Sequence, residues 1–265
     1  PMPIIQISFT STVFEESAQL LSEKLQLPLR TDQSSTYDYL LNISELGLSL
    51  VPSADKGYGP ISCDFAGGTH SHRRRFGGGN GQAIAKAIGV SGKFYPRVLD
   101  LTAGLGGDSF VLASLGCTMT MLERNPIVHS LLADGLARAG GSVEDDSELA
   151  AIMARISLIQ GNSADYLEQG SNDGSLRADV VYVDPMFPER KKSAKVKKQM
   201  QAFHAIVGTD PDADKLLALA LNVANYRVVV KRPAGAEYLA DTKPSYSLEG
   251  KSTRYDIYTL KKLPG

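Results

Sequence analysis

The 265-residue chain lacks a long hydrophobic segment, has only two cysteines and carries almost no net charge. No run of about 18 apolar residues occurs, so we expect no transmembrane helix and no membrane partner. Pro1–Gln6 shows neither the basic flank nor the long apolar core of a secretory signal peptide. Cys63 and Cys117 lie far apart, and His70 and His72 have no cysteine or carboxylate at ligand spacing. We therefore expect reduced thiols, no metal site and a cytoplasmic protein.

The formal net charge of −1 hides two strongly basic stretches. Residues 186–200 contain six lysines and arginines against one glutamate, and a glycine-rich stretch at 67–81 contains three consecutive arginines. A single charged run is usually solvated surface, but two of them in a nearly neutral protein favour a partner that carries phosphates. The residues that we expect to contact a nucleic acid are Arg73, Arg74, Arg75, Phe76, Arg190, Lys191, Lys192, Lys195, Lys197 and Lys198.

The pattern of apolar residues divides the chain into a small α+β unit, residues 1–90, and a larger unit, residues 91–265. We expect the small unit to bind the substrate. Its pattern predicts helices at 14–25 and 82–88 and short strands at 5–9, 39–43, 46–51 and 60–65. The larger unit alternates strands with helices, which is typical of a parallel, Rossmann-like α/β sheet. Its predicted strands lie at 97–101, 118–122, 156–160, 180–184, 226–231, 246–248 and 255–260, the last two as an antiparallel pair.

A glycine-rich turn follows the first strand of the larger unit. Gly104 and Gly106 permit a tight strand-to-helix turn that brings a ligand against bare backbone. A dinucleotide-binding fingerprint would continue with a third glycine, where this chain has Ser109. Glu123, at the end of the neighbouring strand, can accept hydrogen bonds from both hydroxyls of a ribose. S-adenosylmethionine has a ribose but no pyrophosphate, and we therefore predict it as the cofactor.

Polar side chains also end the other strands of this unit, and the carboxyl ends of parallel strands meet at one edge of a sheet. Asp100 ends the first strand and is placed for the ammonium group of the cofactor or for an ordered water. Asn162 and Ser163 follow the third strand and are placed for the adenine. Each of these residues alone is a common turn or cap former. Four such strand ends together indicate a binding site.

The stretch at 180–188 indicates the chemistry. An apolar strand ends at Asp184, and Pro185 prevents further strand pairing. A planar aromatic amine is a poor nucleophile, because its lone pair is delocalised into the ring. The Asp184 carboxylate and the Pro185 carbonyl can accept its N–H groups as positive charge develops, and Phe187 offers a ring face to the base. We predict that these three residues are catalytic.

These motifs resemble those of known methyltransferases. Asp100–Asp108 resembles motif I of the class I methyltransferases, and Asp184–Pro188 is similar to the Asn/Asp-Pro-Pro-Tyr/Phe motif of amino-group methyltransferases. Over residues 60–262 the chain closely resembles a bacterial family of small-subunit ribosomal RNA guanine-N2 methyltransferases. Further motifs that carry this resemblance are His72–Gly79, Glu123–Pro126 and Lys191–Lys198.

The resemblance implies a class I methyltransferase sheet with S-adenosylmethionine as the cofactor. It implies that the substrate is a guanosine near the 3′ end of 16S ribosomal RNA, either free or in the 30S subunit. On the matching positions it implies cofactor contacts at Gly107, Asp108, Glu123, Arg124, Asn162, Ser163 and Asp184.

Four functional classes are open on the sequence alone, and an S-adenosylmethionine-dependent RNA methyltransferase leads them. An amino-group methyltransferase acting on DNA or protein comes second, because the Asp-Pro-x-Phe motif recognises a planar amine rather than a particular polymer. A nicotinamide-dependent oxidoreductase is disfavoured by Ser109 and gives residues 184–188 no role. A non-enzymatic RNA-binding module would account for the basic stretches but not for the strand ends.

Overall fold

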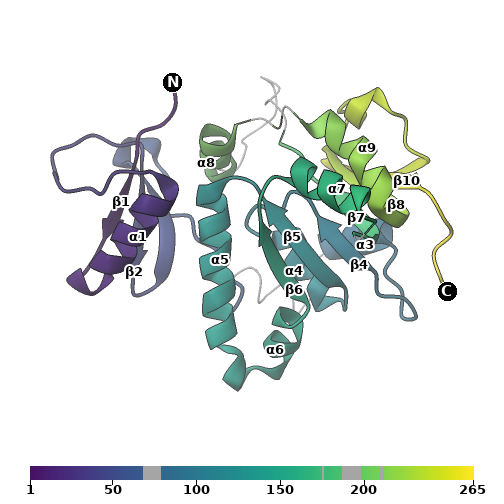
Figure 1. The fold of residues 1–265 in the computed structure, drawn as a ribbon, viewed down its shortest axis with the longest axis horizontal. Coiled ribbons are helices and arrows are strands. Elements are labelled where there is room, and N and C mark those ends of the chain that lie inside the picture. The colour runs from purple at the N-terminus through teal and green to yellow at the C-terminus, as the bar shows by residue number, and fades with distance from the viewer. Residues whose placement is uncertain (68–78, 175, 187–197, 209, 211) are drawn as a thin grey trace.

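The structure is a computed structural model that describes residues 1–67, 79–174, 176–186, 198–208, 210 and 212–265. In that part of the chain the backbone forms two β-sheets, one of three strands near the N-terminus and one of seven strands (Figure 1). The long helix α5 (Pro126–Gly141) runs between them. The mixed α/β class predicted from the sequence is confirmed.

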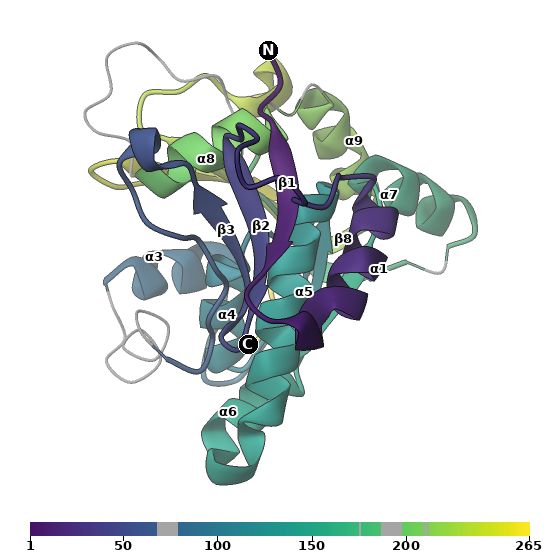
Figure 2. The same cartoon turned by 90° about the vertical axis from the view of Figure 1, so that its left-hand side faces the viewer.

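The N-terminal sheet has the order β1-β2-β3. Strand β1 (Ile5–Phe9) is parallel to β2 (Tyr39–Ser44), and β2 is antiparallel to β3 (Gly47–Pro52). Helix α1 (Glu15–Leu25) packs beside the strands, with Ala18 fully buried (Figure 2). The helix expected at 14–25 and the first three expected strands of this unit are therefore present.

The seven-stranded sheet has the order β6-β5-β4-β7-β8-β10-β9. The first five strands of that order are parallel, and β10 is antiparallel to both of its neighbours. The strands are β4 (Arg97–Asp100), β5 (Thr118–Glu123), β6 (Ile156–Gln160), β7 (Ala178–Val183), β8 (Ala224–Pro233), β9 (Tyr246–Glu249) and β10 (Thr253–Thr259). The other helices are α3 (Gly79–Ile88), α4 (Gly107–Ser114), α6 (Ser147–Met153), α7 (Ser163–Asn172), α8 (Lys198–Val207) and α9 (Ala213–Val223).

Both faces of this sheet are covered by helices, as a parallel sheet requires. Alternate residues of β7 show the division: Val180 and Tyr182 belong to the core that contains α3, α4 and α6, whereas Val181 and Val183 belong to the core that contains α7 and α9. The period of two residues along a strand produces this alternation. Because both faces are filled, the carboxyl ends of the strands are the place where this sheet can offer a ligand site.

The prediction of a strand at 60–65 is wrong. Ile61 makes an isolated bridge with Leu50 of β3, and the chain then leaves that sheet. Cys63 and Phe65 are each 1% exposed because they pack in the core of the large sheet, which also contains Ile88 of α3. Burial of these two side chains draws the segment away from the edge of β3. Cys63, Phe65 and the buried residues of α3 therefore pack with the large sheet.

Helix α5 joins the two sheets through a short polar chain. Asp134 accepts a hydrogen bond from the backbone N–H of Leu48 in β3 at 3.0 Å, and it binds Arg138 at 2.9 Å. The Arg138 guanidinium also donates to the carbonyl of Cys63. One ion pair on α5 thus fixes both β3 and the segment that leaves it.

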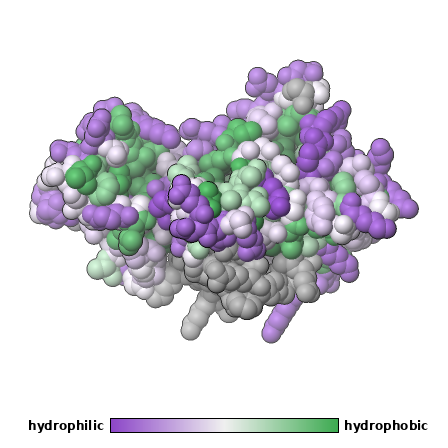
Figure 3. Space-filling view, turned by 90° about the horizontal axis from the view of Figure 1, so that it is seen from below, coloured by the Kyte–Doolittle hydropathy of each residue, from purple (hydrophilic) through white to green (hydrophobic). Residues whose placement is uncertain are grey.

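The N-terminal unit keeps several apolar side chains on its surface. Figure 3 shows apolar residues gathered on the lobe at the left, which is the N-terminal unit in Figure 1. Its strongly exposed members among the described residues include Met2, Val13, Leu20 and Leu46, the last at 85%. Exposed apolar residues are common on protein surfaces, and these assign no partner by themselves. No helix within the described ranges combines the length and the apolar character needed to cross a bilayer.

The joint at α5 can be tested by a pair of glycine substitutions on that helix. A Cβ at Gly135 would lie 2.6 Å from the Cβ and Sγ of Cys63, whereas a Cβ at Gly140 would meet nothing within 4 Å. We expect Gly135→Ala to lower the free energy of unfolding by about 1–3 kcal/mol through overpacking. Gly140→Ala should raise it by about 0.5–1 kcal/mol through better helix propensity. Urea unfolding with unchanged m-values measures both, and equal effects would contradict this packing of the segment.

Candidate active site

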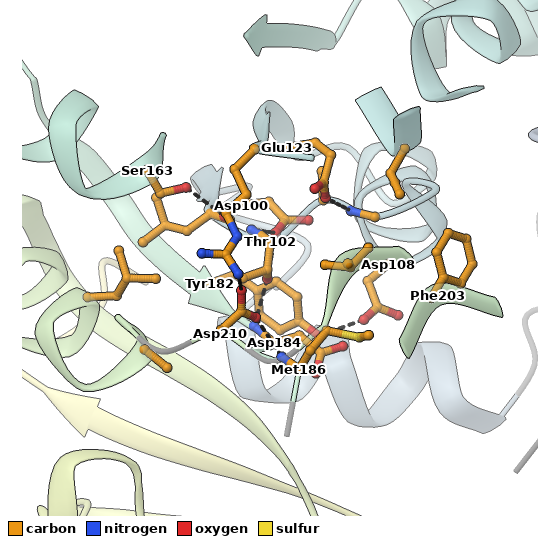
Figure 4. A pocket seen from close by; sticks show the side chains of 18 of the residues that line it. Asp100, Thr102, Asp108, Glu123, Ser163, Tyr182, Asp184, Met186, Phe203 and Asp210 are labelled. Carbon is orange, nitrogen blue, oxygen red and sulfur yellow. Dashed lines mark hydrogen bonds and ion pairs between the residues drawn. The ribbon is translucent and has the colours of Figure 1, made fainter. Parts of the chain in front are cut away.

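A cavity of about 300 Å³ opens at the carboxyl ends of the parallel strands (Figure 4). Its wall comes from the turn between β4 and α4, the ends of β5 and β7, the start of α7, and one side of α8. Nine of the ten residues predicted to bind the cofactor line it: Asp100, Gly104, Gly107, Asp108, Glu123, Arg124, Asn162, Ser163 and Asp184. Strand ends that are far apart in the sequence thus meet in one cavity.

The tenth residue, Gly106, shapes the turn instead of lining the cavity. Gly104 and Gly106 have φ values of 57° and 75°, in the left-handed region that glycine adopts without strain. A Cβ at Gly106 would lie 3.0 Å from Leu132 and 3.1 Å from Phe65. A Cβ at Gly104 would meet nothing within 4 Å. The backbone at Gly104 therefore faces open space, where a ligand can lie against it.

Asp100 is held beneath this turn. Its side chain is 1% exposed, and it accepts hydrogen bonds from the Ser109 hydroxyl at 2.6 Å and from the Thr102 N–H at 3.0 Å. Burial raises the pKa of Asp100 to about 6, against the opposing effect of these hydrogen bonds. Ser109, which replaces the third glycine of a dinucleotide fingerprint, thus serves to orient Asp100.

Thr102 is a site residue that the sequence reasoning missed. Its hydroxyl accepts a hydrogen bond from the backbone N–H of Asp184 at 2.7 Å. The neighbouring β4 and β7 are already paired, from Val98 with Val180 onward. The Thr102 hydroxyl extends that connection beyond the strand ends and fixes the backbone that carries Asp184.

Two backbone N–H groups hold the Glu123 carboxylate in a fixed orientation. One carboxylate oxygen accepts from the N–H of Gly104 and the other from the N–H of Asn125, each at 2.9 Å. The side chain is 8% exposed, and burial raises its pKa above the usual value. The two hydrogen bonds fix the plane of the carboxylate and leave each oxygen a further lone pair for a hydroxyl. This donor and acceptor set fits the ribose of S-adenosylmethionine.

Asn162 and Ser163 lie where the sequence places them, and both also support the backbone. The Asn162 side chain caps α7 by accepting from the N–H groups of Ala164 and Asp165. The Ser163 hydroxyl donates to the carbonyl of Leu101 at 2.7 Å. Because the hydroxyl proton is already engaged in this hydrogen bond, the Ser163 oxygen can act only as an acceptor, for example for the adenine amine.

Asp184 directly follows the last residue of β7 and lines the cavity. Its side chain is 42% exposed. Burial of the site raises the pKa of its carboxyl to about 7, while Lys231 opposes this rise. Pro185 is buried beside it. Burial therefore favours the protonated form of Asp184, and Lys231 favours the ionised form.

Asp210 ties the chain after Asp184 to the other side of the cavity. Its carboxylate accepts from the N–H of Met186 at 2.7 Å and forms an ion pair with Arg124 at 2.6 Å. Figure 4 shows Asp210, Met186 and Asp184 together at one side of the cavity. The sequence predicts Arg124 as a cofactor contact. The structure shows in addition that Arg124 pairs with Asp210, in the loop before α9.

Helix α8, which the sequence reasoning missed, supplies the apolar side of the cavity through Phe203 and Val207. In the sequence reasoning this part of the chain was considered only as the end of a basic run, and the apolar spacing that follows was not examined. Several predicted contacts lie outside the described residues: Arg73, Arg74, Arg75, Phe76, Phe187, Arg190, Lys191, Lys192, Lys195 and Lys197. Lys198 begins α8, and its side chain is likewise outside the description.

The order of the parallel strands is that of a Rossmann-like sheet. A glycine turn after the first strand and a fixed carboxylate at the end of the second complete the binding site. Fold and site together define a class I S-adenosylmethionine-dependent methyltransferase.

Comparisons with known proteins identify the group within this class. The chain matches the model of a family described as "Putative SAM-dependent methyltransferase" over residues 20–260. It is 52% identical over 259 residues to the ribosomal RNA small subunit methyltransferase J of Cellvibrio japonicus (strain Ueda107), with 96% of this chain and 97% of that protein covered. The protein of the same name from Pseudomonas aeruginosa (strain UCBPP-PA14) is 48% identical over 261 residues, with 98% and 97% covered. The chain belongs to the ribosomal RNA small subunit methyltransferase J family.

A solved structure agrees with this membership. The crystal structure of a SAM-dependent methyltransferase from Neisseria gonorrhoeae has a TM-score of 0.72 and 35% sequence identity, with 96% of this chain and 95% of that chain covered. The predictions of the family and of S-adenosylmethionine as the cofactor are thereby confirmed. The oxidoreductase and the non-enzymatic RNA-binding module are removed from the alternatives.

The role of Glu123 can be measured by cofactor binding alone. We expect Glu123→Ala to weaken S-adenosylmethionine binding by about 1.5–3 kcal/mol, or about 10- to 150-fold, because the ribose loses a charged acceptor. Glu168→Ala is the control, since Glu168 pairs with Lys215 at the surface. Isothermal titration calorimetry with folded variants measures both affinities. An unchanged affinity for Glu123→Ala would show that the ribose binds elsewhere.

Proposed function

We propose that this enzyme transfers a methyl group from S-adenosylmethionine to the exocyclic N2 amine of a guanosine near the 3′ end of 16S ribosomal RNA. The observation that carries the proposal is the position of Asp184, which ends β7 in the same cavity as the ribose acceptor Glu123. The names of the curated relatives support the small-subunit ribosomal RNA as the substrate. An amino-group methyltransferase acting on DNA or protein is the alternative.

The chemistry requires acceptors for the amine more than it requires a base. S-adenosylmethionine supplies a methyl group that its sulfonium already activates. The Asp184 carboxylate and the Pro185 carbonyl accept the two N–H groups, so that the nitrogen lone pair is released from the ring as the N–C bond forms. The bond from the methyl group to sulfur breaks in the same step and S-adenosylhomocysteine would leave, while the surplus amine proton passes to the Asp184 carboxylate or to solvent. The Thr102 hydroxyl holds the Asp184 backbone in place at 2.7 Å, which limits the motion of these acceptors. Correct alignment of nitrogen, methyl carbon and sulfur then supplies much of the rate.

The guanine must leave its stack to reach this cavity, at a cost of a few kcal/mol. Contacts of basic residues with phosphates can offset that cost. The basic run leads directly into α8, whose Phe203 and Val207 line the cavity. This connection supports phosphate contacts close to the reacting base. We propose that the reaction takes place in the cytoplasm, on 16S ribosomal RNA that is free or assembled in the 30S subunit.

The proposed function is tested by substitution of Asp184. Asp184→Ala should almost abolish methyl transfer while RNA binding survives, because phosphate contacts supply most of the affinity. Asp184→Asn should keep partial activity, since it retains an oxygen acceptor but loses the negative charge. Asp179→Asn at the opposite end of β7 is the matched control, because Asp179 binds Arg97 away from the cavity.

The measurement is single-turnover transfer of labelled methyl groups at saturating S-adenosylmethionine, with 16S ribosomal RNA and 30S subunits from a deletion strain as substrates. Mass spectrometry of RNA fragments locates the methyl group. Wild-type labelling of N2 in one guanosine near the 3′ end, with the order wild type, Asn, Ala, agrees with the proposal. Labelling of DNA or protein alone, or near wild-type turnover by Asp184→Ala, would overturn it.

A further inference from the structure

Five aspartates line one cavity, Asp212 among them, and the structure gives the other four different partners. Asp100 is bonded to Ser109 and Thr102, and Asp210 is paired with Arg124. Asp108 accepts from the Tyr182 hydroxyl at 2.6 Å and from the Lys231 ammonium at 3.0 Å. For Asp184, the one cation within 4 Å among the described residues is the same Lys231, at 3.8 Å.

Lys231 is held firmly in this position by its strand. It lies on β8, which pairs with β7 on one side and with β10 on the other. Its neighbour Val230 pairs with Val183, next to Asp184, and Lys231 itself lies opposite Tyr255. The backbone is thus fixed from both sides, and the side chain is 27% exposed. Its ammonium group lies beside two residues of the cavity wall, Asp108 and Asp184, and comes from a part of the sheet that no cofactor motif includes.

We propose that Lys231 is a positioning residue that favours the ionised form of the Asp184 carboxylate and leaves it free to accept the amine of the substrate. The inference rests on the proposed function of Asp184 and deepens it. A distance of 3.8 Å allows an ion pair but is too long for a hydrogen bond. Lys231 therefore compensates the charge of Asp184 without occupying an oxygen lone pair that the amine needs. Asp108, at 3.0 Å, takes the direct hydrogen bond and anchors the ammonium group.

The surrounding charges explain why Asp184 depends on this lysine. Burial raises the pKa of Asp184, and the negative charges of Asp108, Asp100 and Asp210 raise it further. Lys231 is the strongest influence in the opposite direction.

Three groups near Asp184 keep fixed protonation states around neutral pH, whereas burial raises the pKa of Asp100, which does not contact Lys231, to about 6. Burial acts to lower the pKa of Lys231, but Asp108 and Asp184 outweigh this effect and raise it, so the ammonium stays charged. Burial raises the pKa of Tyr182 well above its usual value and that of Tyr255 to about 12, so both phenols stay neutral. Arg124, the remaining cation, is committed to Asp210. Loss of Lys231 therefore removes the positive charge that Asp184 shares with Asp108.

The first test is the pH dependence of kcat/KM for methyl transfer, which reports groups of the free enzyme. In wild type the rate should rise with pH through a midpoint near 7, where Asp184 becomes ionised. Lys231→Met should move that midpoint upward by about one pH unit or more, because an opposite charge is lost. Lys231→Arg should restore the wild-type midpoint, and Lys215→Met at the surface should leave it unchanged. A Lys231→Met enzyme that is slower at every pH with an unmoved midpoint would overturn the inference.

A second measurement separates this inference from the proposed function. The carboxyl carbon of Asp184 can be titrated by NMR in protein labelled with ¹³C aspartate, with the signal assigned by its absence in Asp184→Asn. Lys231→Met should titrate at higher pH than wild type, and Asp108→Asn at lower pH, because it removes a negative charge and leaves Lys231 to Asp184. The Asp108→Asn result stands even if Lys231→Met fails to fold. Unmoved titrations would overturn the role of Lys231, whereas absence of methyl transfer by wild type would overturn the proposed function alone.

Discussion

The central constraint on this molecule is the gathering of carboxylates, two of them buried, at the ends of parallel strands. An ionised carboxylate removed from water is costly unless hydrogen bonds or a cation compensate it. Asp100 and Glu123 are compensated by hydroxyl and backbone donors, which fix their orientation. Asp108 and Asp184 share Lys231. The site is therefore rigid at Asp100 and Glu123 and sensitive to charge at Asp108 and Asp184.

The three-stranded N-terminal sheet is connected to this site through the packing of α8 and α5. On α8, Phe203 and Val207 line the cavity, while Ala202 and Ile206 pack in the core of the N-terminal unit. Helix α5 completes the connection, since Leu131 lies in that same core and Asn125 caps the helix directly after Glu123. The N-terminal unit thus supports the walls of the cavity from outside. A unit that binds RNA at this place would present the substrate to the carboxyl ends of the strands.

Sequence reasoning succeeded where local pattern determines structure. The apolar strands that end in Asp100, Glu123 and Asp184, and the left-handed glycines between β4 and α4, are visible in short windows of sequence. It failed where packing between residues distant in sequence determines the structure. At 60–65 the pattern predicts a strand, but Cys63 and Phe65 are buried in the core of the large sheet. Thr102, Asp210 and Lys231 are ordinary polar residues whose roles arise only from neighbours across strands and loops. No spacing in the sequence could have identified them.

The most direct test of the account is a crystal structure of the enzyme with S-adenosylhomocysteine and a short RNA containing the target guanosine. The account predicts the ribose hydroxyls of the cofactor product on Glu123 and the guanine N2 within hydrogen-bond distance of the Asp184 carboxylate. Lys231 should remain beside Asp108 without contacting the base. A guanine that presents another atom to the sulfur, or that lies away from Asp184, would contradict the assignment of this strand end as the place of methyl transfer.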